Sequence, residues 1–175
     1  MNLSMGKNDS FPSSEFEENL SILREIYFFS ELPLETLKVL AYLSTHESFR
    51  AGDYLFHQDD DDGQSFYIIS GKASLLHKGG DQPVELRAFA TGAFLGSLAL
   101  LGSARRLFSL EARTDLSCLI LTREKFTKAL EQFPGMAPRV LQALVNSIHS
   151  WEQQVLAEAD EGCPTCRQSV GVSLL

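Results

Sequence analysis

Short apolar runs separated by turn residues occupy the middle of the chain and limit the folds open to it. Runs of about four to eight residues that are rich in Val, Ile, Leu, Phe and Tyr and end at Gly, Asp or Ser predict β-strands. We expect strands at Thr45–Arg50, Tyr54–His57, Ser65–Gly71, Ala73–Lys78, Val84–Ala90, Leu107–Ala112 and Leu116–Leu121. Strands this short and this closely spaced predict a mainly β fold, an antiparallel β jelly roll or double-stranded β-helix.

Helical periodicity appears on both sides of these strands. Apolar residues recur at spacings of three and four from Ser14 to Tyr27, and Ser30 is expected to cap the start of a second helix. After the strands, Thr122 is expected to cap a helix that ends near Gln132. A long helix is expected from about Ala137 to Ala159. The predicted fold therefore has N-terminal helices and a long C-terminal helix around the β-strands.

The chain of 175 residues is long enough for one domain with extensions. Residues 1–13 are polar and are expected to be a disordered N-terminus. Residues 14–133 are expected to form the β domain with its flanking helices, and 134–159 the long C-terminal helix. Residues 160–175 are expected to form a tail.

The stretch Gly92–Glu111 predicts a phosphate-binding pocket. A short helix that begins at Gly96 leaves backbone N–H groups without partners at its N-terminus, which favours an anion. Arg106, arriving from the next strand, adds a planar charge that can donate two hydrogen bonds to one phosphate. The alternative is that Arg106 pairs with a carboxylate such as Glu111 or Asp115.

The same residues resemble the phosphate-binding cassette of cyclic-nucleotide-binding domains. In that family F-G-E-L-A-L is followed, after four residues, by P-R-A-A-[ST]. Gly96, Leu98-Ala99-Leu100, Arg106 and Ser109 stand at matching positions. The runs A-G-D-Y-L-F-H-Q and S-F-Y-I-I-S-G-K-A also match the family, so the resemblance spans about residues 28–133.

Three departures from the family pattern concern the ligand. Ser97 replaces the glutamate that binds the ribose hydroxyl, Arg105 replaces a proline, and Leu107 and Phe108 replace two small residues. A hydrogen bond to a carboxylate contributes about 1.5–3 kcal/mol, so we expect Ser97 to weaken binding about ten- to a hundredfold. Phe108 would crowd the phosphate if it faces inward, and strand alternation would place it opposite to Ser109.

The resemblance implies a stand-alone regulatory domain that binds cAMP, cGMP or a related phosphate ligand. Binding would reposition the helices after Leu121 and be read by an unknown downstream protein. The alternative is a ligand-free dimerisation or scaffold module. The residues implied as ligand-binding are Gly96, Ser97, Leu98, Ala99, Arg105, Arg106, Leu107 and Ser109.

The long helix carries a pattern that predicts a homodimer. Its apolar residues are spaced 3, 4, 3, 4 as in a coiled-coil seam, although the same stripe could pack on its own chain. The residues are Leu141, Leu144, Ile148, Trp151 and Val155. In the family this helix is a dimer seam, and a DNA-binding helix-turn-helix domain often follows it. Only the tail follows here, and a net charge of −8 offers no basic face, so no DNA binding is expected.

No catalytic or strong metal-binding pattern is found in the sequence. The histidines lie on separate elements without metal-ligand spacing, which disfavours a cupin-type enzyme, and Asp59–Asp62 lacks the spacing of an EF-hand and is expected to be a solvated loop. Cys163-x-x-Cys166 supplies only half of a zinc site. Without a secretory signal or a membrane-length apolar run, a cytoplasmic location with reduced thiols and no membrane contact is expected.

Overall fold

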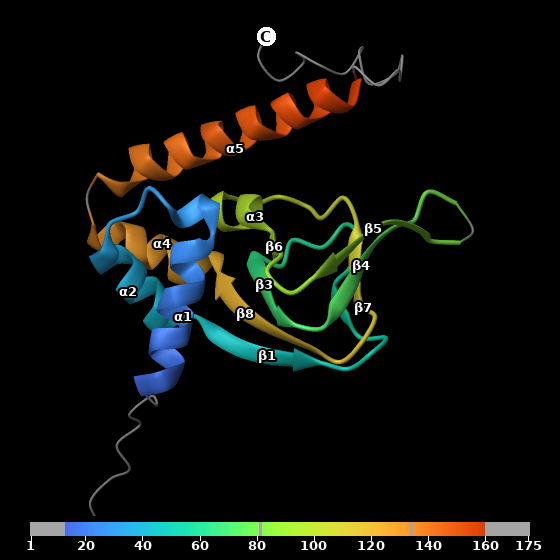
Figure 1. Ribbon diagram of the computed structural model, residues 1–175, viewed down its shortest axis with the longest axis horizontal. Helices are drawn as coiled ribbons and strands as arrows, with labels where there is room; N and C mark the ends of the chain where they lie inside the picture. The colour runs from blue at the N-terminus through green and yellow to red at the C-terminus, as the bar shows by residue number, and fades with distance from the viewer. Residues whose placement is uncertain (1–12, 81, 134, 160–175) are drawn as a thin grey trace, which may run out of the picture.

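Two antiparallel four-stranded sheets form the body of the protein in the computed structural model, which describes residues 13–80, 82–133 and 135–159 (Figure 1). The first sheet has the order β1 (Thr45–Phe49), β8 (Leu116–Thr122), β3 (Gln64–Ser70) and β6 (Phe94–Leu95). The second has the order β2 (Tyr54–Phe56), β7 (Ser109–Ala112), β4 (Lys72–His77) and β5 (Val84–Ala90). This jelly-roll-like arrangement confirms the predicted fold class.

The sheet register is fixed by alternating apolar residues. In β3, Phe66 and Ile68 are both fully buried and pair with Ile120 and Cys118 of β8. These side chains belong to one core cluster between the two sheets. Burial of this cluster raises the pKa of the Cys118 thiol to about 12. Cys118 is therefore an unreactive core residue at neutral pH.

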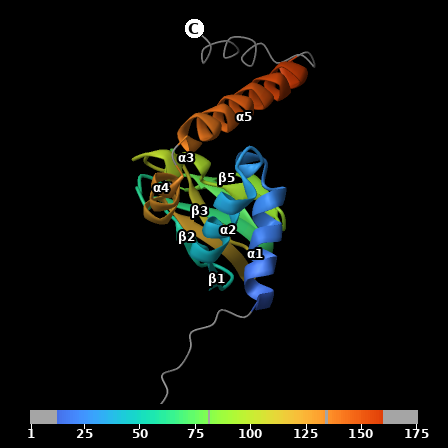
Figure 2. The same cartoon turned by 90° about the vertical axis from the view of Figure 1, so that its left-hand side faces the viewer.

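Most of the helices gather at one end of the sheets; α5 starts at that end, runs along the top of the view in Figure 1 and points away from the body in Figure 2. The bounds of the N-terminal helices are α1 Ser13–Glu25, the 3₁₀ turn η1 Tyr27–Phe29 and α2 Leu34–Leu43. Those of the later helices are α3 Ser97–Leu101, α4 Arg123–Gln132 and α5 Met136–Ala159.

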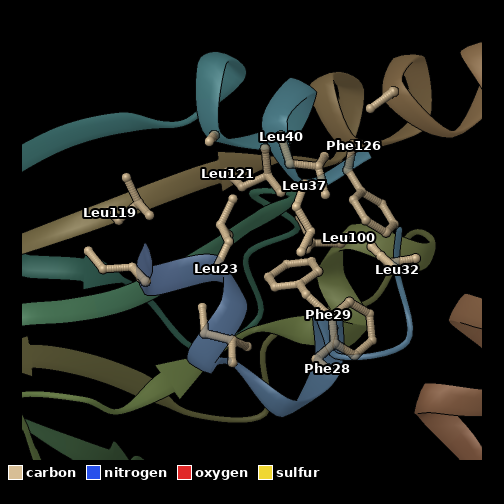
Figure 3. Packing of buried hydrophobic residues seen from close by; sticks show 14 of the residues in the cluster. Leu23, Phe28, Phe29, Leu32, Leu37, Leu40, Leu100, Leu119, Leu121 and Phe126 are labelled. Atoms are coloured by element: carbon tan, nitrogen blue, oxygen red, sulfur yellow. The ribbon is translucent and has the colours of Figure 1, made fainter. Parts of the chain in front are cut away.

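A second apolar cluster joins the helices to the first sheet, and it anchors α3. Phe29 of η1, Leu100 of α3 and Phe126 of α4 are almost fully buried and lie close together (Figure 3). The rings of Phe29 and Phe126 have centroids 6.2 Å apart. Any movement of α3 must therefore be accommodated by η1 and α4, because a packed core does not deform freely.

Two local predictions were wrong and one is confirmed. Ser30 does not cap a helix: it ends η1, and α2 begins at Leu34 after Pro33. Leu107 and Phe108 do not extend a strand, because the backbone of Arg106 pairs with Asp59 and Asp60 and draws the chain along that loop. Thr122 does cap α4, since its side chain accepts a hydrogen bond from the Lys125 N–H.

The predicted terminal segments fall largely outside the described residues. This holds for the N-terminal segment 1–13 apart from Ser13, the first residue of α1, and for the tail 160–175 with Cys163 and Cys166. Among the helices that the structure does describe, none is long and apolar enough to cross a membrane.

Candidate functional site

A cavity of about 500 Å³ lies beside α3 and the segment that follows it. β2 and β4 contribute Phe56 and Leu75 to its wall. All the predicted ligand residues except Ser109 line the cavity: Gly96, Ser97, Leu98, Ala99, Arg105, Arg106 and Leu107. The fold thus brings together in one wall the residues that the sequence and its family resemblance grouped.

Ser109 lies away from this cavity, and Phe108 takes its place in the wall. Ser109 lines a different cavity beside Tyr54, and its hydroxyl accepts a hydrogen bond from the Gln58 N–H at 2.8 Å. This hydroxyl therefore ties β7 to the loop after β2. Of Phe108 and Ser109, it is therefore Phe108 that faces the cavity.

Gly96 lets the cavity wall approach the first sheet closely. Its φ of 88° lies in the left-handed region, which glycine adopts without strain. A Cβ at this position would lie 2.7 Å from the Gln64 carbonyl oxygen and 2.9 Å from Nη1 of Arg106. A side chain at residue 96 would therefore displace both the strand and the arginine.

Arg106 is held by Asp62, not by Glu111 or Asp115. Its Nη2 lies 2.7 Å from Oδ1 of Asp62, and its Nε lies 3.1 Å from the same oxygen. The two side chains are only 9% and 18% exposed, and the guanidinium lies 4.1 Å from the centre of the Phe56 ring. The expected alternative partners lie elsewhere: Glu111 is 3.9 Å from Arg113, and Asp115 accepts from the Ala51 N–H.

One nitrogen of Arg106 remains available to a ligand. Nε and Nη2 donate to Asp62, and Nη2 also donates to the Gln64 carbonyl oxygen. Nη1 lies beside Gly96 in the cavity wall, and no described residue accepts a hydrogen bond from it. Asp62 thus fixes the plane of the guanidinium and leaves its outer end for an anion.

The family model of the cyclic nucleotide-binding domain matches residues 46–133, which include this cassette and the strands around it. The chain belongs to this family. Domains of this kind are typically regulatory and not catalytic. The part of this cyclic nucleotide-binding domain that the structure describes contains no cluster of three or more His, Cys, Asp or Glu side chains placed to hold a metal ion.

The domain is similar to protein kinase regulatory subunits and to a bacterial cyclic nucleotide-binding-like protein. It is 33% identical over 112 residues to a cAMP-dependent protein kinase regulatory subunit of Emericella nidulans, covering 63% of this chain and 26% of the relative. The chain thus spans about a quarter of the length of such curated relatives. A cyclic nucleotide-binding-like protein from Brucella abortus aligns with a TM-score of 0.61 and 28% identity, covering 65% of this chain and 98% of that one. The regulatory domain of Toxoplasma gondii PKA with cAMP aligns with a TM-score of 0.65 and 18% identity, covering 79% and 51%.

Arg123, which the sequence analysis missed, ties the cassette to α4. It is the first residue of α4, and its Nε donates to the Ala99 carbonyl oxygen of α3 at 2.7 Å. Its Nη2 pairs with Asp61, whose other oxygen accepts from the Ser103 hydroxyl. Hydrogen bonds from Arg123 and Ser103 hold the pKa of the Asp61 carboxyl below its usual value. Asp59, Asp60 and Asp61 are exposed, as predicted for a solvated loop, but Asp61 and Asp62 also form ion pairs with Arg123 and Arg106.

The predicted dimer seam on α5 is only partly described. Leu141 is 60% exposed and Ile148 is 37% exposed, whereas Leu144 is half-buried. Among the side chains of α5 that the structure describes, those of Val140, Ala143 and Glu152 are buried. The side chains of Trp151 and Val155 lie outside the described residues. The helix therefore uses one stripe within its own chain and leaves part of the predicted seam uncovered.

Proposed function

We propose that this chain is a regulatory domain whose cavity binds a cyclic nucleotide, cAMP or cGMP, and passes the bound state to α4 and α5. The observation that carries the proposal is that Arg106 lines the cavity with a side chain only 9% exposed, and that its Nη1, which lies beside Gly96, has no acceptor among the described residues. The charged residues of the lining are Arg105 and Arg106, so the wall carries positive charge in a protein of net charge −8. An anion is the ligand that suits such a wall.

The size and polarity of the cavity suit a nucleotide. A volume of about 500 Å³ lies within the range of small-molecule sites, about 300–1,000 Å³. Phe56, Leu75 and Leu95 give an apolar wall against which a base can pack. Arg105 is exposed at the same cavity and forms no ion pair with the residues that the structure describes, so it adds a second charge for the phosphate.

The second candidate function is a ligand-free scaffold, and two observations favour it. Asp62 already satisfies most of the donors of Arg106, and the Phe108 ring occupies part of the cavity wall. Thermal unfolding with added cAMP or cGMP separates the two functions, because a ligand of the native state raises the melting temperature. A rise at micromolar nucleotide supports the sensor, and no rise at millimolar nucleotide supports the scaffold.

Replacing Ser97 with glutamate is expected to raise the affinity for cAMP or cGMP about tenfold or more, because a carboxylate accepts strongly from the ribose hydroxyl. Calorimetry on Ser97→Glu measures the change. Ser97 also lines a neighbouring cavity that contains Glu25, so the neutral variant Ser97→Gln controls for side-chain size. Equal affinities for the two variants would show that the carboxylate has no ribose contact.

We also propose that α5 forms a homodimer through its exposed apolar residues, to which Leu141 and Ile148 belong. Replacing Ile148 with Asp is expected to yield folded monomers, because a charge in a helix seam opposes association. Sedimentation measures the change, and Ser150→Asp on an exposed position of the same helix is the control. An unmodified protein that sediments as a monomer at micromolar concentration would contradict the dimer.

A further inference from the structure

His77, the last residue of β4, has a buried nitrogen without a partner. Its Nδ1 is shielded from solvent and has no hydrogen bond to any residue in the described ranges. Its Nε2 faces the turn after β4, where a Cβ on Gly79 would lie 3.2 Å away. Buried polar atoms are nearly always hydrogen-bonded, so this unpartnered nitrogen is a candidate contact for a ligand.

The ring of Phe108 is in contact with both His77 and the cavity. The edge-on rings of His77 and Phe108 have centroids 5.8 Å apart at an interplanar angle of 72°. Phe108 also lines the cavity, whereas His77 does not. Phe108 is therefore the wall that separates the unpartnered imidazole from the space proposed for the nucleotide.

The side chain of Phe108 is only partly buried. Phe108 belongs to the segment between α3 and β7, outside every strand and helix. The backbone of Arg106 fixes this segment to Asp59 and Asp60, whereas its neighbour Leu107 is 72% exposed. Rotation of the Phe108 side chain would open the cavity toward His77 without breaking the pairing of β7 with β4, which begins at Ser109.

We propose that His77 is a ligand-binding residue of this cavity, reached when the nucleotide displaces the Phe108 ring. The inference rests on the proposed function and adds a contact to it. A wall with two arginines and no carboxylate selects an anion, and the oxygens of an anion are acceptors. The Nδ1–H of the imidazole then donates to a phosphate oxygen, alongside Nη1 of Arg106.

A double-mutant cycle tests this contact. Phe108→Ala is expected to raise the affinity for cAMP or cGMP about tenfold, because it removes the obstructing ring and uncovers His77. Adding His77→Phe, which keeps a ring but removes both nitrogens, is expected to cancel most of that gain. His57→Phe is the matched control, because His57 is exposed and stacks on Tyr54 beside a different cavity.

A second measurement uses the unmodified protein in case Phe108→Ala fails to fold. The ¹⁵N resonance of His77 Nδ1 is expected to shift when cAMP or cGMP is added, whereas the resonances of His57 stay in place. Two results would overturn the role of His77 but leave the proposed function standing. One is equal nucleotide affinity of Phe108→Ala with and without His77→Phe. The other is an Nδ1 resonance that does not shift when the nucleotide is bound. Absence of binding by every variant and by the unmodified protein at millimolar nucleotide would overturn the proposed function as well.

Discussion

Replacing Arg106 with alanine is expected to lower the free energy of unfolding of the empty protein by about 3 kcal/mol, because it leaves Asp62 charged and mostly buried without its partner. The guanidinium also packs on the Phe56 ring, and that contact is lost as well. An Arg106 that stood unpaired in the cavity would contribute little to stability. The pairing seen here makes Arg106 part of the fold as well as of the proposed site.

A double-mutant cycle with Asp62→Ala measures the coupling by chemical denaturation. The double variant is expected to be more stable than the sum of the single losses predicts, since it leaves no unpaired charge. Arg113→Ala is the control: its pair with Glu85 is about half exposed and is expected to contribute less than about 1 kcal/mol. If Arg106→Ala lowers the free energy of unfolding by no more than Arg113→Ala does, the pair of Arg106 with Asp62 does not stabilise the fold.

Because Arg106→Ala is expected to lower the stability of the protein, a loss of nucleotide binding in this variant has two explanations. Lost nucleotide binding in that variant would combine a damaged cavity with a missing phosphate contact. Arg105 is exposed and without an ion partner in the described ranges, so Arg105→Ala removes a charge from the cavity at little cost to folding. A weaker response to nucleotide in Arg105→Ala is therefore the cleaner sign of an anionic ligand.

Replacing Gly96 with alanine is expected to lower the free energy of unfolding by about 2–4 kcal/mol, because the Cβ adds backbone strain and overlaps the Gln64 carbonyl oxygen. The same Cβ would push Nη1 of Arg106 out of the cavity wall, so the thermal response to nucleotide is expected to fall too. Denaturation and thermal shift measure the two effects separately.

Gly92→Ala is the matched control for Gly96→Ala. Gly92 has a φ of 91°, close to the 88° of Gly96, but no atom lies within 4 Å of the Cβ that it would carry. Its substitution is expected to cost about 1 kcal/mol from backbone strain alone. Equal losses at the two glycines would mean that the close approach at Gly96 is relieved by a small shift of the chain.

The jelly roll could be predicted from the sequence because its strands are local patterns. Phe66 and Ile68 alternate with less buried neighbours, and the turns between strands carry glycine and aspartate. The resemblance of the cassette was also sufficient to group the residues that line the cavity, apart from Ser109. Both kinds of pattern lie in continuous stretches of the chain, where spacing alone indicates which side chains share a face.

The partners of the arginines could not be predicted because they depend on an irregular path. The segment 102–108 has no periodicity that predicts its course, and only its pairing with Asp59 and Asp60 brings Arg106 beside Asp62. Leu107 and Phe108 looked like strand residues because they are apolar and precede a strand. The charge of Asp59–Asp62 predicts solvent exposure. It does not predict that Asp61 and Asp62 pair with Arg123 and Arg106.

The hydrogen bond from Arg123 to the Ala99 carbonyl oxygen links α3 to α4. Arg123 is the first residue of a ten-residue helix, which is about 15 Å long. A tilt of about 10° around this end would move the opposite end of α4 by about 3 Å. Since α5 begins just beyond that opposite end, such a tilt would move the start of the helix that carries the exposed apolar residues. If the proposed nucleotide binds, α4 would act as a lever between the cavity and α5.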